Sequence, residues 1–202
     1  MQLIYICLFG YLIGSVPFAF IIGKLFYHTD VRQHGSGNLG GSNTGRVLGK
    51  KAGLAVMTLD ILKVTLVVFV ANVLCGSVLA VSSAAVSAAI GHCYPVFAKF
   101  HGGKAVATMY GFLFGLWVCL GYSPLTFFLP LVTFMAVLFL FKIVSLSSMV
   151  SSIAAALYIW LCGKPLPVVL AVLVFALLII VRHSSNIRRM IAGNERKVKW
   201  IK

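Results

Sequence analysis

Residues 34–46 are richer than any other part of the chain in groups that could hold phosphate. The stretch reads HGSGNLGGSNTGR, and its candidate ligands are Ser36, Gly37, Asn38, Gly40, Gly41, Ser42, Asn43 and Arg46. Repeated glycine permits positive φ and lets successive N–H groups face one anion. Arg46 adds a planar guanidinium that pairs with phosphate oxygens. We predict a phosphate cradle, although the spacing differs from that of a nucleotide P-loop; a flexible loop touching lipid head groups is the alternative.

A second glycine-rich stretch follows Gly91 and His92. Gly102, Gly103 and Lys104 come just before an apolar run that begins near residue 106. At that place a phosphate could meet free N–H groups at the start of a helix. The alternative is a tight turn whose lysine extends toward the membrane surface.

The third stretch, residues 182–189, reads RHSSNIRR. If the apolar helix before it continues, His183 and Asn186 share one face. A polybasic patch that binds anionic lipid would explain the arginines, but it gives no reason for the histidine and the asparagine.

The elements that must position these stretches are membrane spans. Apolar residues make up 61% of the 202 residues, charged residues only 10%, and the mean hydropathy is +1.05, whereas a soluble domain is about half apolar and about a quarter charged. About 20 apolar residues cross a bilayer core. We therefore predict an all-α integral membrane protein that forms a single domain over residues 1–202. Its seven or so spans are residues 3–23, 53–73, 77–97, 106–122, 125–141, 143–161 and 166–181, with five or six complete crossings as the alternative.

Charge predicts the orientation. With the N-terminus outside and the C-terminus in the cytoplasm, all 17 basic residues except Lys63 and Lys164 fall on the cytoplasmic side or in the cytoplasmic tail, as the positive-inside rule requires. Lys63 and Asp60 lie within the second span, where an ion pair is favoured over catalysis and could brace the loops. The five cysteines show no ligand spacing, so we expect no metal site. Because the basic residues are divided among short loops, nucleic acid is a poor candidate partner.

Together the three stretches resemble the bacterial acyl-phosphate-dependent glycerol-3-phosphate acyltransferases of the PlsY type. The resemblance runs nearly end to end and includes Gly14-Ser15-Val-Pro17, residues 35–46 and 48–53, Gly91-His92 with Pro95, Gly102-Gly103-Lys104 with Thr108, and Arg182-His183 with Asn186-Ile187 and Glu195. The chain departs from the usual pattern at His101, where lysine or arginine is common, and at Ala105 and Val64, where glycine is usual.

The resemblance implies a bacterial inner-membrane enzyme without a cofactor, whose active site faces the cytoplasm. It would transfer an acyl group from acyl phosphate to the 1-hydroxyl of glycerol 3-phosphate, giving lysophosphatidic acid and inorganic phosphate. Ser36, Arg46, His183 and Asn186 would be catalytic, the last two holding glycerol 3-phosphate. The glycines of the second loop would bind acyl phosphate, and Glu195 would be structural.

The residues fit this reaction on their own chemistry, since two anionic substrates mainly need positioning and charge screening. Neither Asp30 nor Asp60 has a histidine five positions before it, which argues against the glycerolipid acyltransferases that use a His/Asp pair as the base. The base would be His183 or the substrate's own phosphate. A transporter of phosphorylated anions is the competing class, but it needs polar groups near the midplane of the membrane.

Overall fold

The computed structural model describes residues 1–198, which form helices and no strand, so the prediction of an all-α protein is confirmed. The long helices are α1 (Gln2–Gly14), α4 (Lys50–Cys75), α5 (Val78–Cys93), α6 (Val106–Leu120), α7 (Leu125–Phe141), α8 (Val144–Leu161) and α9 (Leu166–Arg182). The short ones are α2 (Phe18–Tyr27), η1 (Val31–Gln33), α3 (Gly41–Val47), η2 (Val96–Ala98) and α10 (Ser184–Ile191).

Each predicted span coincides with one helix or with a broken pair, but fewer helices than predicted meet a length criterion for crossing a membrane. Within residues 1–198, four segments are long and apolar enough: Gln2–Tyr27, Lys50–Cys75, Val78–Ala98 and Val144–Leu161. The bent pair α9 and α10 makes a fifth if it is counted as one span. Helices α6 and α7 are apolar but have only 15 and 17 residues. Seven complete crossings are therefore not confirmed.

The helices pack closely because small residues lie where their axes approach. A Cβ on Gly10 or Gly14 of α1 would lie 2.4 Å or 2.1 Å from the backbone carbonyl oxygens of Ala84 and Ala88 on α5. A Cβ on Gly111 of α6 would likewise lie 2.3 Å from the Ile61 carbonyl oxygen on α4. Such small-residue contacts are typical of helix pairs in membranes, where close van der Waals packing replaces the hydrophobic driving force.

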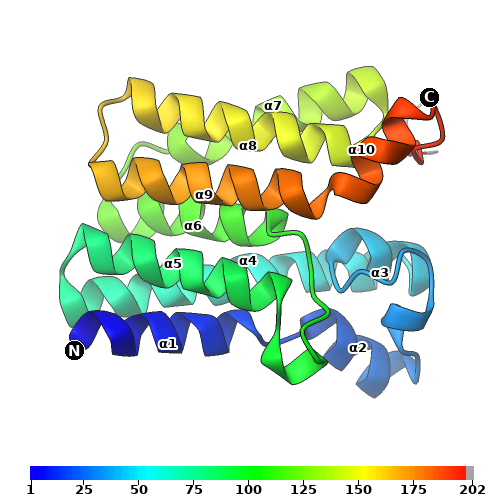
Figure 1. Cartoon of the computed structure of the whole chain (residues 1–202), viewed down its shortest axis with the longest axis horizontal. Coiled ribbons are helices and arrows are strands. Elements are labelled where there is room, and N and C mark those ends of the chain that lie inside the picture. The colour runs from blue at the N-terminus through cyan, green and yellow to red at the C-terminus, as the bar shows by residue number, and fades with distance from the viewer. Residues whose placement is uncertain (199–202) are drawn as a thin grey trace.

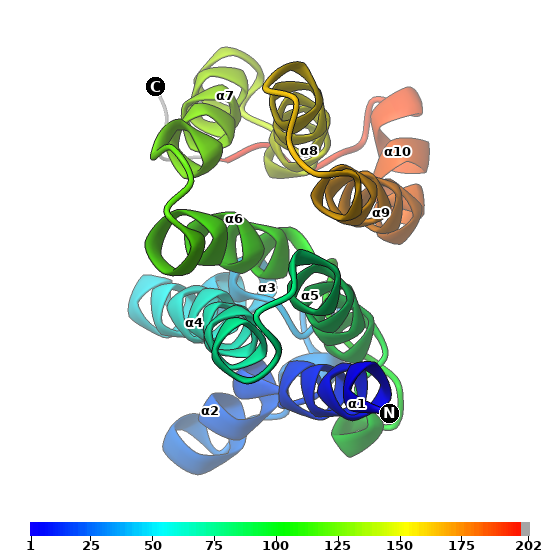
Figure 2. The same cartoon turned by 90° about the vertical axis from the view of Figure 1, so that its left-hand side faces the viewer.

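The chain places its polar segments at one end of the bundle. Figure 1 shows α2, α3 and α10 at the end opposite the N-terminus, and Figure 2 shows α7, α8 and α9 as a group beside the helices α1, α4, α5 and α6. Helix α1 ends before Pro17, which has no N–H to donate, and α2 then turns away from it. All three candidate segments consequently lie at the same end.

Candidate active site

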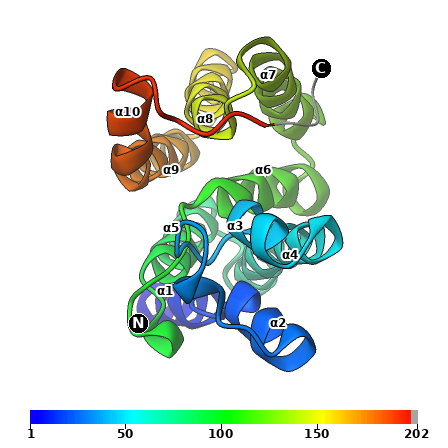
Figure 3. The same cartoon turned by 90° about the vertical axis from the view of Figure 1, so that its right-hand side faces the viewer.

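The three candidate segments meet at the loop formed by Gly102, Gly103 and Lys104, which leads into α6. From the first segment, Asn38 Nδ2 donates to the Gly102 carbonyl oxygen at 3.1 Å. From the third, Arg182 Nε donates to the Gly103 carbonyl oxygen at 3.1 Å and Nη2 donates to that of Gly102 at 3.3 Å. Figure 3 shows this end of the bundle, with α3 and α10 on either side of the chain that enters α6. Segments far apart in the sequence thus form one site.

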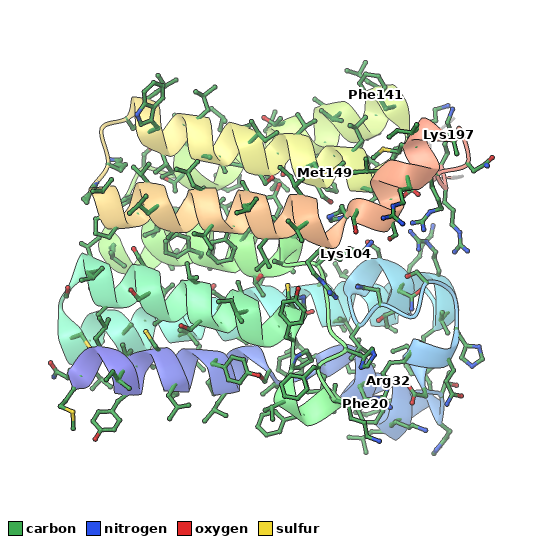
Figure 4. All side chains as sticks on the ribbon, viewed as in Figure 1. Phe20, Arg32, Lys104, Phe141, Met149 and Lys197 are labelled. Atoms are coloured by element: carbon green, nitrogen blue, oxygen red, sulfur yellow. The ribbon has the colours of Figure 1, made fainter. Side chains whose placement is uncertain are left out.

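Lys104 extends from this loop to the third segment. Its Nζ donates to Asn186 Oδ1, and Figure 4 shows Lys104 at the end of the bundle where α3 and α10 lie. The Asn186 amide donates in turn to Glu195 Oε1 at 2.5 Å. Glu195 also accepts hydrogen bonds from Ser145 Oγ at 2.8 Å and from Arg189 Nε at 2.7 Å. This carboxylate joins the tail to α8 and α10, which agrees with the structural role that the resemblance implies for it.

The first segment is closed by a clamp centred on Asn43. Its Oδ1 accepts from the Ser36 N–H at 2.8 Å, and its Nδ2 donates to the carbonyl oxygens of Val31 and His34 at 3.1 and 3.2 Å. Gly35 and Gly37 have φ of 67° and 70°, the positive values that glycine permits. Because the Asn43 side chain is buried and bonded within the loop, its geometry favours holding the loop's shape over direct contact with a substrate.

Helix α3 lies against the start of α4 through glycines. A Cβ on Gly41 would lie 2.7 Å from the Gly53 carbonyl oxygen, and a Cβ on Gly53 would lie 2.6 Å from the Gly45 Cα. Glycine is therefore required at position 41 because α3 and α4 pack closely there. The spacing of glycines in the sequence did not reveal this reason. Ser36, Ser42 and Arg46 are exposed at this end of the molecule, so an incoming phosphate can reach them.

The second loop is tight and strained. A Cβ on Gly102 would lie 2.1 Å from the His92 carbonyl oxygen, and one on Gly103 would lie 1.9 Å from His92 Nε2. The Gly103 N–H donates to the His92 carbonyl oxygen at 2.9 Å, so this N–H is not free for an anion. Lys99, Phe100 and Ala105 have φ between 55° and 60°. Ala105 therefore keeps the left-handed backbone for which glycine is suited, although it carries a methyl group.

In the third segment the condition for a continuous helix is not met, because the apolar helix bends at His183. Helix α9 ends at Arg182, and α10 begins at Ser184 after a bend of 56°. His183 and Asn186 are both buried. His183 Nδ1 lies 2.8 Å from the Ile179 carbonyl oxygen. Since that oxygen can only accept, Nδ1 carries a proton, and Nε2 is the acceptor in the neutral ring.

Basic residues dominate the electrostatics of the site. Burial, followed by repulsion from Arg189, lowers the pKa of Lys104 to about 8. Burial and then the nearby Arg196 also lower the pKa of Arg46. Burial alone would raise the pKa of Glu195, but hydrogen bonds from Asn186, Ser145 and Arg189 lower it overall. Such a cluster of cations with one carboxylate is suited to binding phosphate.

The sequence alone did not identify two residues that contact the Gly102–Lys104 loop, Arg182 and His92. The resemblance includes Arg182 but implies no role for it in the site, and its position next to His183 is the signal that the sequence offers. His92 belongs to the resemblance together with Gly91, yet nothing in the spacing of residues places its ring against Gly103. Among residues 1–198, no group of three or more His, Cys, Asp or Glu side chains is arranged to hold a metal ion.

Comparison with known proteins gives one consistent result. The sequence model of the glycerol-3-phosphate acyltransferase family matches residues 4–193. The chain is 46% identical over 195 residues to the glycerol-3-phosphate acyltransferase of Geobacillus kaustophilus, covering 96% of this chain and 95% of the relative. It is 44% identical over 193 residues to glycerol-3-phosphate acyltransferase 3 of Bacillus anthracis, covering 96% and 93% of the two chains.

Solved structures agree with the sequence comparison. The fold is similar to a crystal structure of PlsY, an integral membrane glycerol 3-phosphate acyltransferase, in its glycerol 3-phosphate form, with a TM-score of 0.90 and 34% identity over 98% of this chain and 96% of the other. The lysophosphatidic acid form of PlsY gives a TM-score of 0.87 and 33% identity over 98% and 95% of the chains.

Proposed function

The chain belongs to the glycerol-3-phosphate acyltransferase family of multi-pass membrane proteins, and from this premise we propose that it transfers a fatty acyl group from acyl phosphate to the 1-hydroxyl of glycerol 3-phosphate. The products are 1-acyl-glycerol 3-phosphate (lysophosphatidic acid) and inorganic phosphate. This reaction is the first step of phospholipid synthesis, and it needs no cofactor.

The observation that carries the proposal is the convergence of all three segments on the Gly102–Lys104 loop. Asn38 and Arg182 bind the loop's carbonyl oxygens, and Lys104 reaches Asn186. The loop leads directly into the apolar helix α6, so a phosphate held at the loop leaves the attached acyl chain next to the membrane. The donor is therefore bound at the loop, with glycerol 3-phosphate beside it at His183 and Asn186.

Transfer takes place by direct attack. The 1-hydroxyl oxygen forms the new ester bond with the acyl carbonyl carbon, the bond from that carbon to the bridging phosphate oxygen breaks, and inorganic phosphate leaves with the electron pair. Cations are effective here because they are already oriented where negative charge develops. Arg46 and Lys104 supply that charge, while Ser36, His183 and Asn186 position the acceptor.

The proton of the attacking hydroxyl goes to the phosphate of glycerol 3-phosphate, whose second pKa is about 6 as in other phosphomonoesters. His183 Nε2 is the second candidate, because the contact between Nδ1 and the Ile179 carbonyl oxygen leaves Nε2 free to accept. A phosphonate analogue with a higher second pKa distinguishes them. The acidic limb of kcat moves upward with the analogue if the substrate is the base, and it stays in place if His183 is the base.

The site faces the cytoplasm at the inner membrane of a bacterium. The basic loops lie at the end of the bundle opposite the N-terminus, and the positive-inside rule assigns that end to the cytoplasm. Helices α6 and α7 complete seven crossings. At about 1.5 Å per residue they are shorter than a bilayer core of about 30 Å, so the bilayer thins around them.

An assay of the purified protein with two donors tests the function. We expect glycerol 3-phosphate to be acylated from palmitoyl phosphate, with release of inorganic phosphate, and little product from palmitoyl-CoA at the same concentration. Turnover with the CoA ester equal to that with the acyl phosphate would refute the donor assignment while leaving the family unchanged.

A further inference from the structure

Three ionisable side chains are buried inside the helical bundle, next to the Gly102–Lys104 loop. Lys63 Nζ lies 2.6 Å from Asp60 Oδ1, 3.0 Å from the Val16 carbonyl oxygen and 3.1 Å from His92 Nδ1. His92 Nδ1 is in turn 3.5 Å from Asp60 Oδ1. None of the three side chains is more than 7% exposed. Charged groups at this depth are costly and are usually retained for a function.

Bracing the fold accounts for part of this cluster. Lys63 satisfies the Val16 carbonyl oxygen at the break between α1 and α2, and Asp60 balances its charge. Neither task requires a histidine. His92 is at the end of α5, where its backbone and its ring both contact the loop proposed to bind the acyl donor.

The hydrogen bonds determine which nitrogen of His92 carries a proton. Lys63 has three N–H groups and no acceptor; it hydrogen-bonds to the Val16 carbonyl oxygen and to His92 Nδ1, and it forms an ion pair with Asp60. Nδ1 therefore accepts from Lys63, and Nε2 carries the proton. Nε2 points at Gly103, because a Cβ on that glycine would be 1.9 Å from it. The ion pair thus fixes both the rotation and the tautomer of the ring.

Gly103 is held from two sides. Its N–H donates to the His92 carbonyl oxygen at 2.9 Å, and its own carbonyl oxygen accepts from Arg182 Nε at 3.1 Å. A change in the His92 ring would therefore displace the backbone of Gly103 relative to Arg182, while the hydrogen bond from Lys104 to Asn186 is kept.

We propose that His92, held in place by the Asp60–Lys63 ion pair, is a positioning residue that sets the geometry of the Gly102–Lys104 loop and thereby the affinity for the phosphate of the acyl donor. This inference rests on the proposed function. It gives the buried ion pair a role in donor binding in addition to its role in the fold.

His92→Gln tests the proposal, with Tyr110→Phe as the matched control. Tyr110 is also buried in the bundle, where its hydroxyl group contacts the Pro130 carbonyl oxygen and Ser151 Oγ, both at 3.0 Å, and neither of these hydrogen bonds involves the loop. We expect His92→Gln to raise KM for acyl phosphate about tenfold and to leave KM for glycerol 3-phosphate within about twofold, since only donor binding is affected. Tyr110→Phe should lower the Tm by a similar amount and change neither KM.

A second variant shows whether the ion pair acts through His92. Asp60→Asn with Lys63→Met removes both charges together, because losing one partner alone leaves an unpaired buried charge. This variant should raise KM for the donor about as much as His92→Gln does, and combining all three substitutions should add nothing further, since groups in one network are not additive. If His92→Gln does not accumulate in the membrane, the charge-neutral variant makes the same comparison against Tyr110→Phe.

The outcomes separate the two claims. If the wild-type protein does not use acyl phosphate, the proposed function is wrong. Phosphate binding at the loop is then measured as the inhibition constant of inorganic phosphate against glycerol 3-phosphate acylation from the donor that the protein does use, in the wild type and in each variant. If the wild-type protein uses acyl phosphate but both variants lower the Tm with an unchanged donor KM, or raise both KM values equally, the cluster is only structural and the inference is refuted. Multiplicative effects in the combined variant would refute the part assigned to the ion pair.

Discussion

Lys104 and Asn186 are 82 positions apart in the chain, yet Nζ of Lys104 donates a hydrogen bond directly to Oδ1 of Asn186. The same Asn186 amide donates to Glu195 at 2.5 Å, so both ends of the amide are fixed. The loop proposed to bind the acyl donor and the segment proposed to bind glycerol 3-phosphate are therefore physically connected. Loss of the Lys104 amine should therefore raise KM for both substrates.

The pH dependence of donor binding should follow Lys104. Burial lowers its pKa to about 8 in the free protein, and only the protonated amine attracts phosphate. Above the acidic limb set by the base, the value of kcat/KM for acyl phosphate should therefore stay constant up to about pH 8 and should fall about tenfold per pH unit beyond it, since this parameter reports pKa values of the free enzyme. Lys104→Arg keeps its charge in this range, so in that variant the decline should shift to higher pH. If the decline of kcat/KM at high pH is the same in Lys104→Arg as in the wild type, another group than Lys104 causes it.

Arg46→Lys should lower kcat strongly although the charge is kept, because lysine cannot offer the planar bidentate contact of a guanidinium. A loss of about 3 kcal/mol of transition-state stabilisation corresponds to roughly a hundredfold decrease. Lys51→Ala is the control, since Lys51 is another exposed basic residue, at the start of α4. The value of kcat is measured for both variants. A near wild-type kcat in Arg46→Lys would mean that Arg46 binds lipid head groups instead of the reacting phosphate.

Much of the architecture was predictable, because a continuous apolar run has few alternatives to a membrane helix. The helix boundaries lie within a few residues of the predicted spans, and the three polar segments lie together. The break at His183 was not predictable, since no glycine or proline marks it. The Asn43 clamp and the contact of the His92 ring with Gly103 depend on tertiary packing, which the spacing of residues does not encode.

Ala105→Gly should stabilise the protein without changing its activity. The left-handed conformation at φ 60° costs an alanine about 1–2 kcal/mol, and the greater freedom of glycine in the unfolded chain offsets about 0.4–1 kcal/mol of the gain. The net increase in the free energy of unfolding is therefore up to about 1.6 kcal/mol, measured by denaturation in detergent. Ala107→Gly, within helix α6, should instead destabilise by about 0.5–1 kcal/mol. Equal destabilisation by both would show that Ala105 is not strained.

Cysteine labelling tests the orientation. Ser42, His101 and Ser185 are exposed at the loop end, and Cys162 is a native exposed cysteine in the turn between α8 and α9. We expect Ser42→Cys, His101→Cys and Ser185→Cys to react with an impermeant maleimide only from the cytoplasmic side, whereas Cys162 reacts only from outside. Each protein tested keeps a single cysteine, either the introduced one or Cys162, and all its other cysteines are replaced by alanine. Labelling of any loop position from the same side as Cys162 would contradict one shared cytoplasmic site.

The central claim is that one site holds both phosphates at once and that the acyl group passes directly between them. Phosphate exchange tests it: the purified protein is incubated with acyl phosphate and radiolabelled inorganic phosphate, with and without glycerol 3-phosphate. Because direct attack forms no acyl-enzyme, we predict no label in acyl phosphate when glycerol 3-phosphate is absent, together with full acyl transfer when it is present. Rapid exchange of label into acyl phosphate without glycerol 3-phosphate would show a covalent acyl-enzyme intermediate and would contradict the account.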